Sequence, residues 1–420
     1  MSEARAPSLW RDGDFVKLWT GQTISEMGSV VTRTALPILA VLTLHAGALE
    51  LGILVASASI AVLLVGLFAG VLVDRLPRRP FMVGADAGRA LLLLSIPVAA
   101  LAGVLGIEQL FLVAFLEAGL GSFFAIAYRS YLPALVAPGR LLEANAKIGM
   151  TSAVAELGGP GIGGALVQLV SAPVAILVDA VSYVVSAASI ALIRAPERAV
   201  APADVPRDLR RELAQGLAAV GRHPLLRPLA LASVTSALFG NFFAALYTLY
   251  ALEELHLSPF LLGLTVSAGG VGSLAATRLV GPLTVRFGLG PTHVWTRIGA
   301  GLLGFLIPLA GGPPLVAVLF LLVPQLVGDG LATVSEINGI TLRQLVTPAR
   351  LLGRVNGTTH VLLEGIAPIG ALAGALVAEA FGIRVAVTVA VLGSFAGLLF
   401  LVRSPIRTMR TGEEAPASPA

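Results

Sequence analysis

The sequence predicts an all-α, polytopic membrane protein with twelve transmembrane helices in two pseudo-symmetric six-helix bundles. Composition is the first reason: 56% of the 420 residues are hydrophobic, only 12% are charged, and the mean hydropathy is +0.90. A water-soluble globule of this size would have to expose a large apolar patch. An internal repeat is the second reason, because PGRLL at 138–142 returns as PARLL at 348–352, an offset of 210 residues.

The repeat extends beyond this segment. A Leu-Gly pair at 51–52 returns at 262–263, and Glu156 and Pro160 are matched by Glu364 and Pro368 at an offset of 208. Leu- and Gly-rich spans also match by chance, but nearly equal offsets favour a true duplication. A duplicated hydrophobic chain of this length is typical of secondary transporters, in which two bundles move around a site at their seam.

The expected spans are apolar runs of about 20 residues, each long enough to cross about 30 Å of hydrocarbon. They begin near residues 16, 49, 81, 108, 143, 173, 226, 258, 291, 314, 353 and 382. We expect the N-terminal six-helix bundle at 1–194 and a cytoplasmic linker with an amphipathic helix on the membrane surface at 195–224. The C-terminal six-helix bundle follows at 225–403, and a disordered cytoplasmic tail at 404–420.

Basic residues indicate the orientation, because Lys and Arg in short loops are retained on the cytoplasmic side of a membrane. They precede the first span, follow the second, fill the linker and close the last span, whereas the loops 45–50, 106–109 and 252–258 contain neither. We therefore expect a multi-pass protein of the plasma (inner) membrane with both termini in the cytoplasm.

Charge and composition also disfavour several classes of function. The formal charge of +4 would suit a nucleic-acid binder, but the basic residues border spans, where they meet anionic lipid headgroups. The chain has no cysteine, and Lys17 and Lys147 complete no phosphate-binding loop. We expect no enzyme activity, no cofactor and no metal, with a proton gradient as the driving force. The expected partners of this monomer are a small-molecule substrate and membrane lipids, and no nucleic acid.

The turn after the second span carries a motif. Residues 70–79 read GVLVDRLPRR, which resembles the signature loop G-x-x-x-D-R-x-x-R-R of the major facilitator superfamily. The resemblance implies that Asp74 and Arg75 help to latch the two halves on the cytoplasmic side. A membrane anchor set only by positive charge would explain the arginines but not Asp74. The matching residues are Gly70, Asp74, Arg75, Arg78 and Arg79.

The fifth span contains the sequence GPGIGG, beginning at Gly159. Pro160 removes a backbone donor, while Gly159, Gly163 and Gly164 let another helix approach closely, so we expect a kinked and tightly packed hinge. The segment resembles the G-P-x-x-G-G element of exporters in the same superfamily, although Ala155 replaces an upstream glycine. Ordinary packing of small residues is the alternative.

Over its whole length the chain resembles the macrolide-efflux and enterobactin-export branch of the superfamily. This resemblance implies efflux of amphiphilic drug-like or siderophore-like small molecules by alternating access and proton antiport, as in multidrug resistance. Phe115 stands where many drug exporters have an arginine, which argues against arginine-assisted coupling at that position. Two alternatives stay open: an importer or lipid-handling transporter of the same fold, and a membrane binding or scaffold protein that does not transport.

Ionisable residues within the spans are the candidates for proton coupling. A charge at the membrane centre costs at least about 2.5–3.5 kcal/mol, and a carboxylate avoids this cost by taking up a proton. By resemblance, spans one, four, seven and ten line the central cavity; they contain Glu26, Arg33, Glu117, Asn241, Gln325, Asp329 and Glu336. We favour Glu26 and Asp329 as coupling acids. Structural pairing, with each other or with polar neighbours, is the alternative for each residue.

Spans five and eleven border the seam by resemblance, and there Glu156 and Glu364 form a pseudo-symmetric pair. His360 precedes Glu364 by four residues, close enough on one helix face to share a proton. Hydrogen bonding that only holds the seam is the alternative. Three charged residues in spans three and six are interpreted as structural scaffold: Asp86, Arg89 and Asp179.

Overall fold

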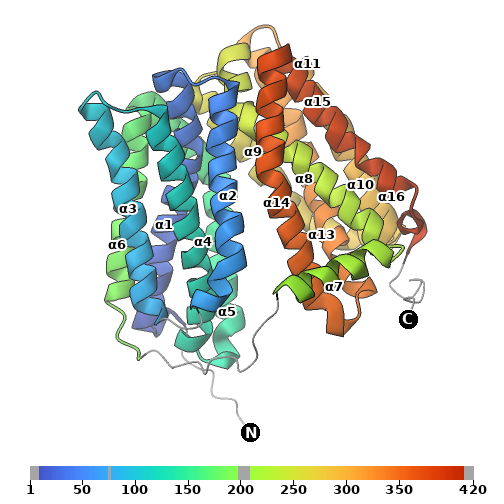
Figure 1. The fold of residues 1–420 in the computed structure, drawn as a ribbon, viewed down its shortest axis with the longest axis horizontal. Helices are drawn as coiled ribbons and strands as arrows, with labels where there is room; N and C mark the ends of the chain where they lie inside the picture. The colour runs from blue at the N-terminus through green and yellow to red at the C-terminus, as the bar shows by residue number, and fades with distance from the viewer. Residues whose placement is uncertain (1–8, 74–76, 197–208, 411–420) are drawn as a thin grey trace. The chain divides into compact units, whose positions relative to one another are not determined.

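The computed structural model describes residues 9–73, 77–196 and 209–410, and these residues form helices and no strand (Figure 1). A polytopic chain satisfies its backbone groups within each helix, because lipid offers no hydrogen-bond partner. The chain divides into two compact units. The first unit is Met1–Leu44 with Ile60–Asp204, and the second unit is His45–Ser59 with Val205–Ala420.

The first unit packs around α1 and α6. Its helices are α1 (Gly13–Leu44), the second part of α2 (Ala48–Val73), α3 (Arg78–Leu101), α4 (Ile107–Leu135), α5 (Leu141–Leu169) and α6 (Ala172–Ala191). α1 lies against α5 and α6, and α3 lies against α4 and α6 (Figure 1). Phe15, Met82 and Tyr131 belong to one buried cluster that joins α1, α3 and α4.

The second unit contains more, and shorter, helical segments. They are α7 (Leu209–Arg222), α8 (Leu226–Leu249), α9 (Pro259–Phe287), α10 (Leu289–Gly304), α11 (Leu306–Leu309), α12 (Pro314–Val323), α13 (Asp329–Val346), α14 (Ala349–Phe381), α15 (Ile383–Ala396) and α16 (Leu398–Val402). A π-helical turn at Pro324–Gly328 joins α12 to α13, and another at Tyr250–Glu254 extends α8. Such turns are frequent at functional sites.

Two helices of the second unit end at a glycine in the left-handed region. Gly288 (φ +94°) follows α9, and Gly382 (φ +89°) follows α14. Glycine adopts these angles without the steric cost of a Cβ. Each glycine amide donates to the preceding turn, Gly288 to Thr284 O at 2.9 Å and Gly382 to Ala378 O at 2.8 Å. The chain can therefore turn directly into α10 and α15.

Within the described residues, ten helices are long and apolar enough to cross a membrane. They confirm a polytopic membrane protein but fall short of the twelve spans expected. α5 is not among the ten because Glu156 and its glycines lower its hydropathy. α10 is not among them because it ends after 16 residues, one residue before the short α11.

The first bundle, predicted as one continuous segment at 1–194, does not coincide with the first compact unit. The start of α2 belongs to the second unit, where a Cβ on Gly52 would lie 3.0 Å from Ala371 O of α14. Ala56 is buried in one cluster with Ala245 and Ala371. Small side chains allow this contact between α2 and α14, and no sequence period signals it.

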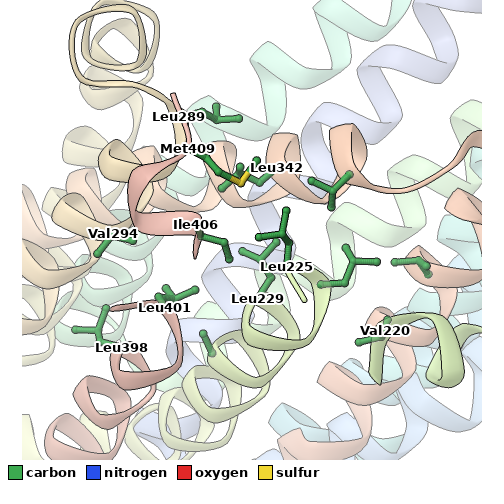
Figure 2. Close-up of a cluster of buried hydrophobic side chains, with 14 residues drawn as sticks. Val220, Leu225, Leu229, Leu289, Val294, Leu342, Leu398, Leu401, Ile406 and Met409 are labelled. Carbon is green, nitrogen blue, oxygen red and sulfur yellow. The ribbon is translucent and has the colours of Figure 1, made fainter. Parts of the chain in front are cut away.

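The tail predicted to be disordered from residue 404 is partly built into the second unit. Pro405–Thr408 forms a 3₁₀ turn, and Ile406 and Met409 enter a buried cluster with residues such as Leu225 and Leu342 (Figure 2). Gly290 N at the start of α10 donates to Met409 O at 2.9 Å. The prediction for 404–410 was wrong because two apolar side chains find a core there. Residues 411–420 lie outside the described residues.

The linker contains the expected helix. α7 packs against α14, and a Cβ on Gly216 would lie 2.7 Å from Arg354 O. One face of α7 therefore covers a helix of the second unit. His223 follows α7, and its Nδ1 accepts from Leu225 N at 3.2 Å and Leu226 N at 3.4 Å. Residues 197–208 of the linker lie outside the described residues.

Candidate functional site

The described part of the signature loop ties α3 to α6. Arg79 donates from Nε to Ile190 O at 3.1 Å and from Nη2 to Ala191 O, at the C-terminal end of α6. These carbonyls lie in the last turn of α6, where a cation suits the negative end of the helix dipole. Arg78 is buried at the start of α3, and Gly70 lies in the last turns of α2. Asp74 and Arg75 lie outside the described residues, so their latch role stays a prediction.

The glycines of the fifth span let α1 approach α5 closely, while the kinked hinge expected at Pro160 stays a prediction. A Cβ on Gly159 would lie 2.6 Å from Val30 Cβ, and one on Gly163 would lie 3.3 Å from Val31 O. Gly164 is buried beside them, and α5 continues through Pro160 without interruption. The second unit repeats this type of contact between α14 and α8. There, a Cβ on Gly374 would lie 2.8 Å from Phe242 O.

Arg33 pairs with Glu156 across the contact between α1 and α5. Its Nη2 lies 2.5 Å from Glu156 Oε1, and both side chains are more than half exposed, at 60% and 53%. The ion pair joins residues that lie 123 positions apart in the sequence. Helical periodicity carries no information about such a partner.

Glu364 has a different environment from Glu156. His360 Nδ1 lies 3.8 Å from Glu364 Oε1, so the predicted proximity of this pair is confirmed. The residue 208 positions after Arg33 is Asn241, whose Nδ2 donates to Ala237 O of its own helix at 2.8 Å. Among the described residues, Glu364 therefore has a titratable imidazole beside it instead of a permanent cation.

Glu117 lies in a charged network inside the first unit. Arg89 donates from Nη2 to Glu117 Oε1 at 2.6 Å and from Nε at 3.0 Å. Tyr183 Oη also donates to this oxygen, at 3.0 Å, and the Arg89 guanidinium lies 3.9 Å from the centre of the Tyr183 ring. The sequence interpretation assigned Glu117 to the cavity and Arg89 to the scaffold. The structure brings them together as a largely buried ion pair, with side chains 11% and 24% exposed.

Asp86 and Asp179 border the same network. Asp86 Oδ1 lies 3.7 Å from Arg89 Nη1, and Ser182 donates to Asp179 Oδ1 at 2.9 Å. Both side chains are fully buried. Sequence reasoning placed these residues in the membrane but could not show that one guanidinium lies within ion-pair distance of both Glu117 and Asp86.

Glu26 has no ion-pair partner among the residues that the structure describes. It lies on α1 and interacts electrostatically with Tyr128 of α4. The Tyr128 hydroxyl is buried without a hydrogen-bond partner. A carboxyl group and an unpartnered hydroxyl on two helices expected to line the cavity keep Glu26 as a coupling candidate.

Asp329 lines a cavity of about 320 Å³ within the second unit. Phe243, Phe395, Ser236 and Arg297 are among the other lining residues. No Lys, Arg or His in the described chain lies within ion-pair distance of the Asp329 carboxylate. The predicted acid therefore lies in a largely apolar cavity without a direct counter-ion.

The turn before Asp329 positions this cavity wall. A Cβ on Gly269 of α9 would lie 2.9 Å from Gln325 Oε1 and 3.4 Å from Asp329 Cγ. Gln325 is held in turn by Tyr247, whose hydroxyl accepts from Gln325 Nε2 at 3.1 Å. The absence of a side chain at Gly269 thus lets both polar groups pack against α9.

A second cavity of about 340 Å³ shares Ser236, Arg297 and Ala332 with the first. Glu336 lines it and interacts electrostatically with Arg297 of α10 and Arg343 of α13. The charged neighbours of Glu336 are therefore these two arginines. Sequence reasoning missed Arg297, although an arginine inside an apolar span was a visible signal.

The sequence model of the Major Facilitator Superfamily matches residues 18–369 of the chain. The chain belongs to the major facilitator superfamily. Superfamily proteins are transporters, so this chain is a membrane-spanning transporter and not an enzyme. The resemblance inferred from the signature loop is therefore confirmed.

Two relatives of this superfamily chain are efflux proteins. The multidrug efflux pump Tap of Mycolicibacterium fortuitum is 28% identical over 378 residues, which cover 85% of this chain and 87% of Tap. Macrolide efflux protein A of Streptococcus pyogenes is 22% identical to this chain, and the matched region covers 88% of this chain and 90% of the relative. These relatives support the drug-efflux branch of the superfamily.

The fold is similar to that of a bacterial homologue of the iron transporter ferroportin in its inward-facing state. The TM-score is 0.73, with 94% of this chain and 99% of the other covered at 20% identity. At this level of identity the comparison shows the major facilitator fold alone.

Proposed function

We propose that this superfamily transporter exports amphiphilic drug-like or siderophore-like small molecules from the cytoplasm by proton antiport. Efflux relatives that cover at least 85% of the chain support this direction of transport. Two six-span bundles would alternate access to the substrate. The protein would act as a monomer in the plasma membrane, without a cofactor or nucleic-acid partner.

Twelve spans complete this arrangement when α5 and the combined α10 and α11 join the ten long apolar helices. Both termini would then lie in the cytoplasm. Arg78 and Arg79 at the start of α3 and Arg222 at the end of α7 support this orientation, because basic residues are retained on that side.

The cavity beside Asp329 is the observation that carries the proposal. Aromatic and aliphatic walls suit an amphiphilic solute, and a few polar groups can orient it. An ionised Asp329 would attract a cationic group, and a proton would displace that group by neutralising the same carboxylate. Substrate and proton would therefore compete for one acid, which is the requirement for antiport.

The other acids divide into coupling and structural groups. Glu117 and Glu156 each form an ion pair with an arginine, which favours a structural role for both acids. Glu26 and the His360–Glu364 pair have no such permanent cation within ion-pair distance in the described chain. We therefore assign proton exchange to Asp329 and Glu26, with His360 and Glu364 as a further exchanging pair.

Proton movement in proteoliposomes tests the proposal. Vesicles with an imposed pH gradient and a pH-sensitive dye would be challenged with lipophilic cations, macrolides, tetracyclines and catechol siderophores. We expect dye recovery with one class of compound and its loss in Asp329→Asn and Glu26→Gln. Glu108→Gln, at an exposed acid where α4 begins, is the matched control and should keep the response.

Each alternative function predicts a different experimental result. Accumulation of solute in intact cells, instead of depletion, would indicate an importer or a lipid-handling transporter. Binding of a compound without any proton or solute flux would indicate a scaffold protein. A wild-type rate in the folded Glu26→Gln, Asp329→Asn double variant would contradict our choice of coupling acids.

A further inference from the structure

Three carboxyl groups in the first unit share one guanidinium. Asp86 and Arg89 lie on α3, Glu117 on α4 and Asp179 on α6. Asp86 and Asp179 have no exposed surface, and the Arg89 side chain is 11% exposed. Within the described residues, no second Lys or Arg lies at ion-pair distance from these carboxyl groups. If all were ionised, the four groups would carry a net charge of about −2 in an apolar bundle.

The hydrogen bonds show which carboxyl group holds the guanidinium. Glu117 Oε1 accepts from Arg89 Nε and Nη2 and from Tyr183 Oη. Asp86 lies 3.7 Å from Arg89 Nη1, beyond hydrogen-bond distance, and Ser186 of α6 interacts with it, but neither buried oxygen has a described partner within 3.5 Å. Asp179 accepts from Ser182 on Oδ1, while its buried Oδ2 interacts with no described partner within 3.5 Å, Thr32 being a more distant neighbour. The ion pair therefore belongs to Arg89 and Glu117.

Burying an ionised carboxylate without hydrogen bonds costs several kcal/mol, and such a group takes up a proton instead. We propose that Asp86 and Asp179 form a proton-binding site inside the first unit, beside the Arg89–Glu117 ion pair. The ligand of this site is the proton. Each aspartate binds it on a carboxyl oxygen and becomes a neutral acid.

Among the described residues, the helices around the site offer no other compensating charge. Ser29 and Thr32 of α1 and Ser182, Tyr183 and Ser186 of α6 face the network as neutral polar groups. Gly28 of α1 leaves room for the acid, because a Cβ there would overlap Asp179 Oδ1. Arg89 and Glu117 are the charged groups that act on Asp179, and Arg89 is the one that acts on Asp86.

The geometry also connects this site to movement of the helices. Arg89 lies between Glu117 on α4 and Asp86 on its own helix, so loss of the Asp86 proton would draw the guanidinium from one carboxylate toward the other. This exchange would change the contact of α3 with α4 and α6. Its use in coupling rests on the proposed antiport, whereas proton binding itself does not.

Infrared spectroscopy of the purified full-length protein in lipid nanodiscs tests the site without substrate. Protonated and ionised carboxyl groups absorb at different frequencies. We expect the wild type at pH 7 to show buried protonated carboxyl bands that weaken in Asp86→Asn and in Asp179→Asn. Glu117→Gln should instead remove an ionised band. Glu143→Gln is the control, because this exposed acid pairs with Arg140 and Lys147.

Thermal unfolding of the same variants gives an independent readout. A protonated aspartate is neutral like asparagine, so both Asn variants should melt close to the wild type, whereas Glu117→Gln should melt at a lower temperature. Protonated bands of unchanged strength in both Asn variants would overturn the proposal. If the variants do not fold, a wild-type spectrum without protonated carboxyl bands at pH 7 would overturn it equally. Neither readout depends on transport, so failure of the exporter assay would leave this result intact.

Discussion

The acids within the spans differ in whether a permanent cation lies beside the carboxylate. Arg89 contacts Glu117 and Arg33 contacts Glu156, but Glu364 has only an imidazole, and Asp329 has no ion-pair partner among the described residues. A guanidinium that donates hydrogen bonds to a carboxylate favours its ionised form, whereas a carboxyl group without such hydrogen bonds can exchange a proton more readily. This difference separates structural acids from candidates for coupling.

The ion pairs of Glu117 and Glu156 should contribute very differently to stability. Removing one partner of a buried pair leaves an unpaired charge, so Glu117→Gln should cost about 3 kcal/mol. The more exposed Glu156 should cost less than about 1 kcal/mol when changed to Gln. Thermal unfolding in detergent would compare both variants with the wild type. Equal losses would contradict the assignment of Arg89 and Glu117 as a buried pair.

His223 predicts a pH dependence at the start of α8. Burial lowers the pKa of His223 below its usual value near 6.5. The unfolded chain therefore binds the proton more tightly, so stability is retained above about pH 6.5 and decreases as the pH falls below it. Asn also accepts hydrogen bonds from the first amides of a helix. His223→Asn should therefore keep these hydrogen bonds at the start of α8 and make the stability less dependent on pH. Melting temperatures of both proteins would be measured between pH 5 and 8. If the inference is wrong, the melting temperature of His223→Asn will depend on pH as steeply as that of the wild type.

At the scale of helices, the glycines of α5 and α14 are explained by contact with α1 and α8. Gly159 faces Val30 closely, whereas the adjacent Gly158 has no atom of another helix within contact distance. The same residue type therefore has two different roles in one motif. Packing, and not a break in the helix, accounts for the GPGIGG segment.

The two neighbouring glycines provide a matched comparison. Gly159→Ala should destabilise the protein by about 1–3 kcal/mol, because the added methyl group would overpack the interface with α1. Gly158→Ala should be neutral or slightly stabilising, since alanine favours the helix. Val30→Ala should rescue Gly159→Ala by restoring space. Unfolding measurements in detergent would contradict this account if both alanine variants behaved alike.

The C-terminal turn should stabilise the second unit. Ile406 is fully buried in the cluster shown in Figure 2, so Ile406→Ala should cost about 2–5 kcal/mol. Deleting 411–420 retains this cluster and serves as the control. Fluorescence-detected melting would measure both variants. A stable Ile406→Ala protein would show that the turn contributes little.

At the scale of the whole molecule, hydrophobic runs and the repeat predicted the helical membrane fold, and the signature loop predicted the superfamily. Partners distant in sequence could not be predicted, because helical periodicity fixes a face but not the residue opposite it. Arg33 with Glu156 and Arg89 with Glu117 are examples. The contact of Gly52 with α14 and the burial of Ile406 were missed for the same reason, since both depend on tertiary packing.

The central claim is that Asp329 couples substrate export to a proton gradient. The most direct measurement compares gradient-driven substrate transport with equilibrium exchange in the same proteoliposomes, for the wild type and Asp329→Asn. We expect the variant to lose accumulation driven by the pH gradient, while exchange of labelled for unlabelled substrate continues. Accumulation at the wild-type level in Asp329→Asn would contradict the account.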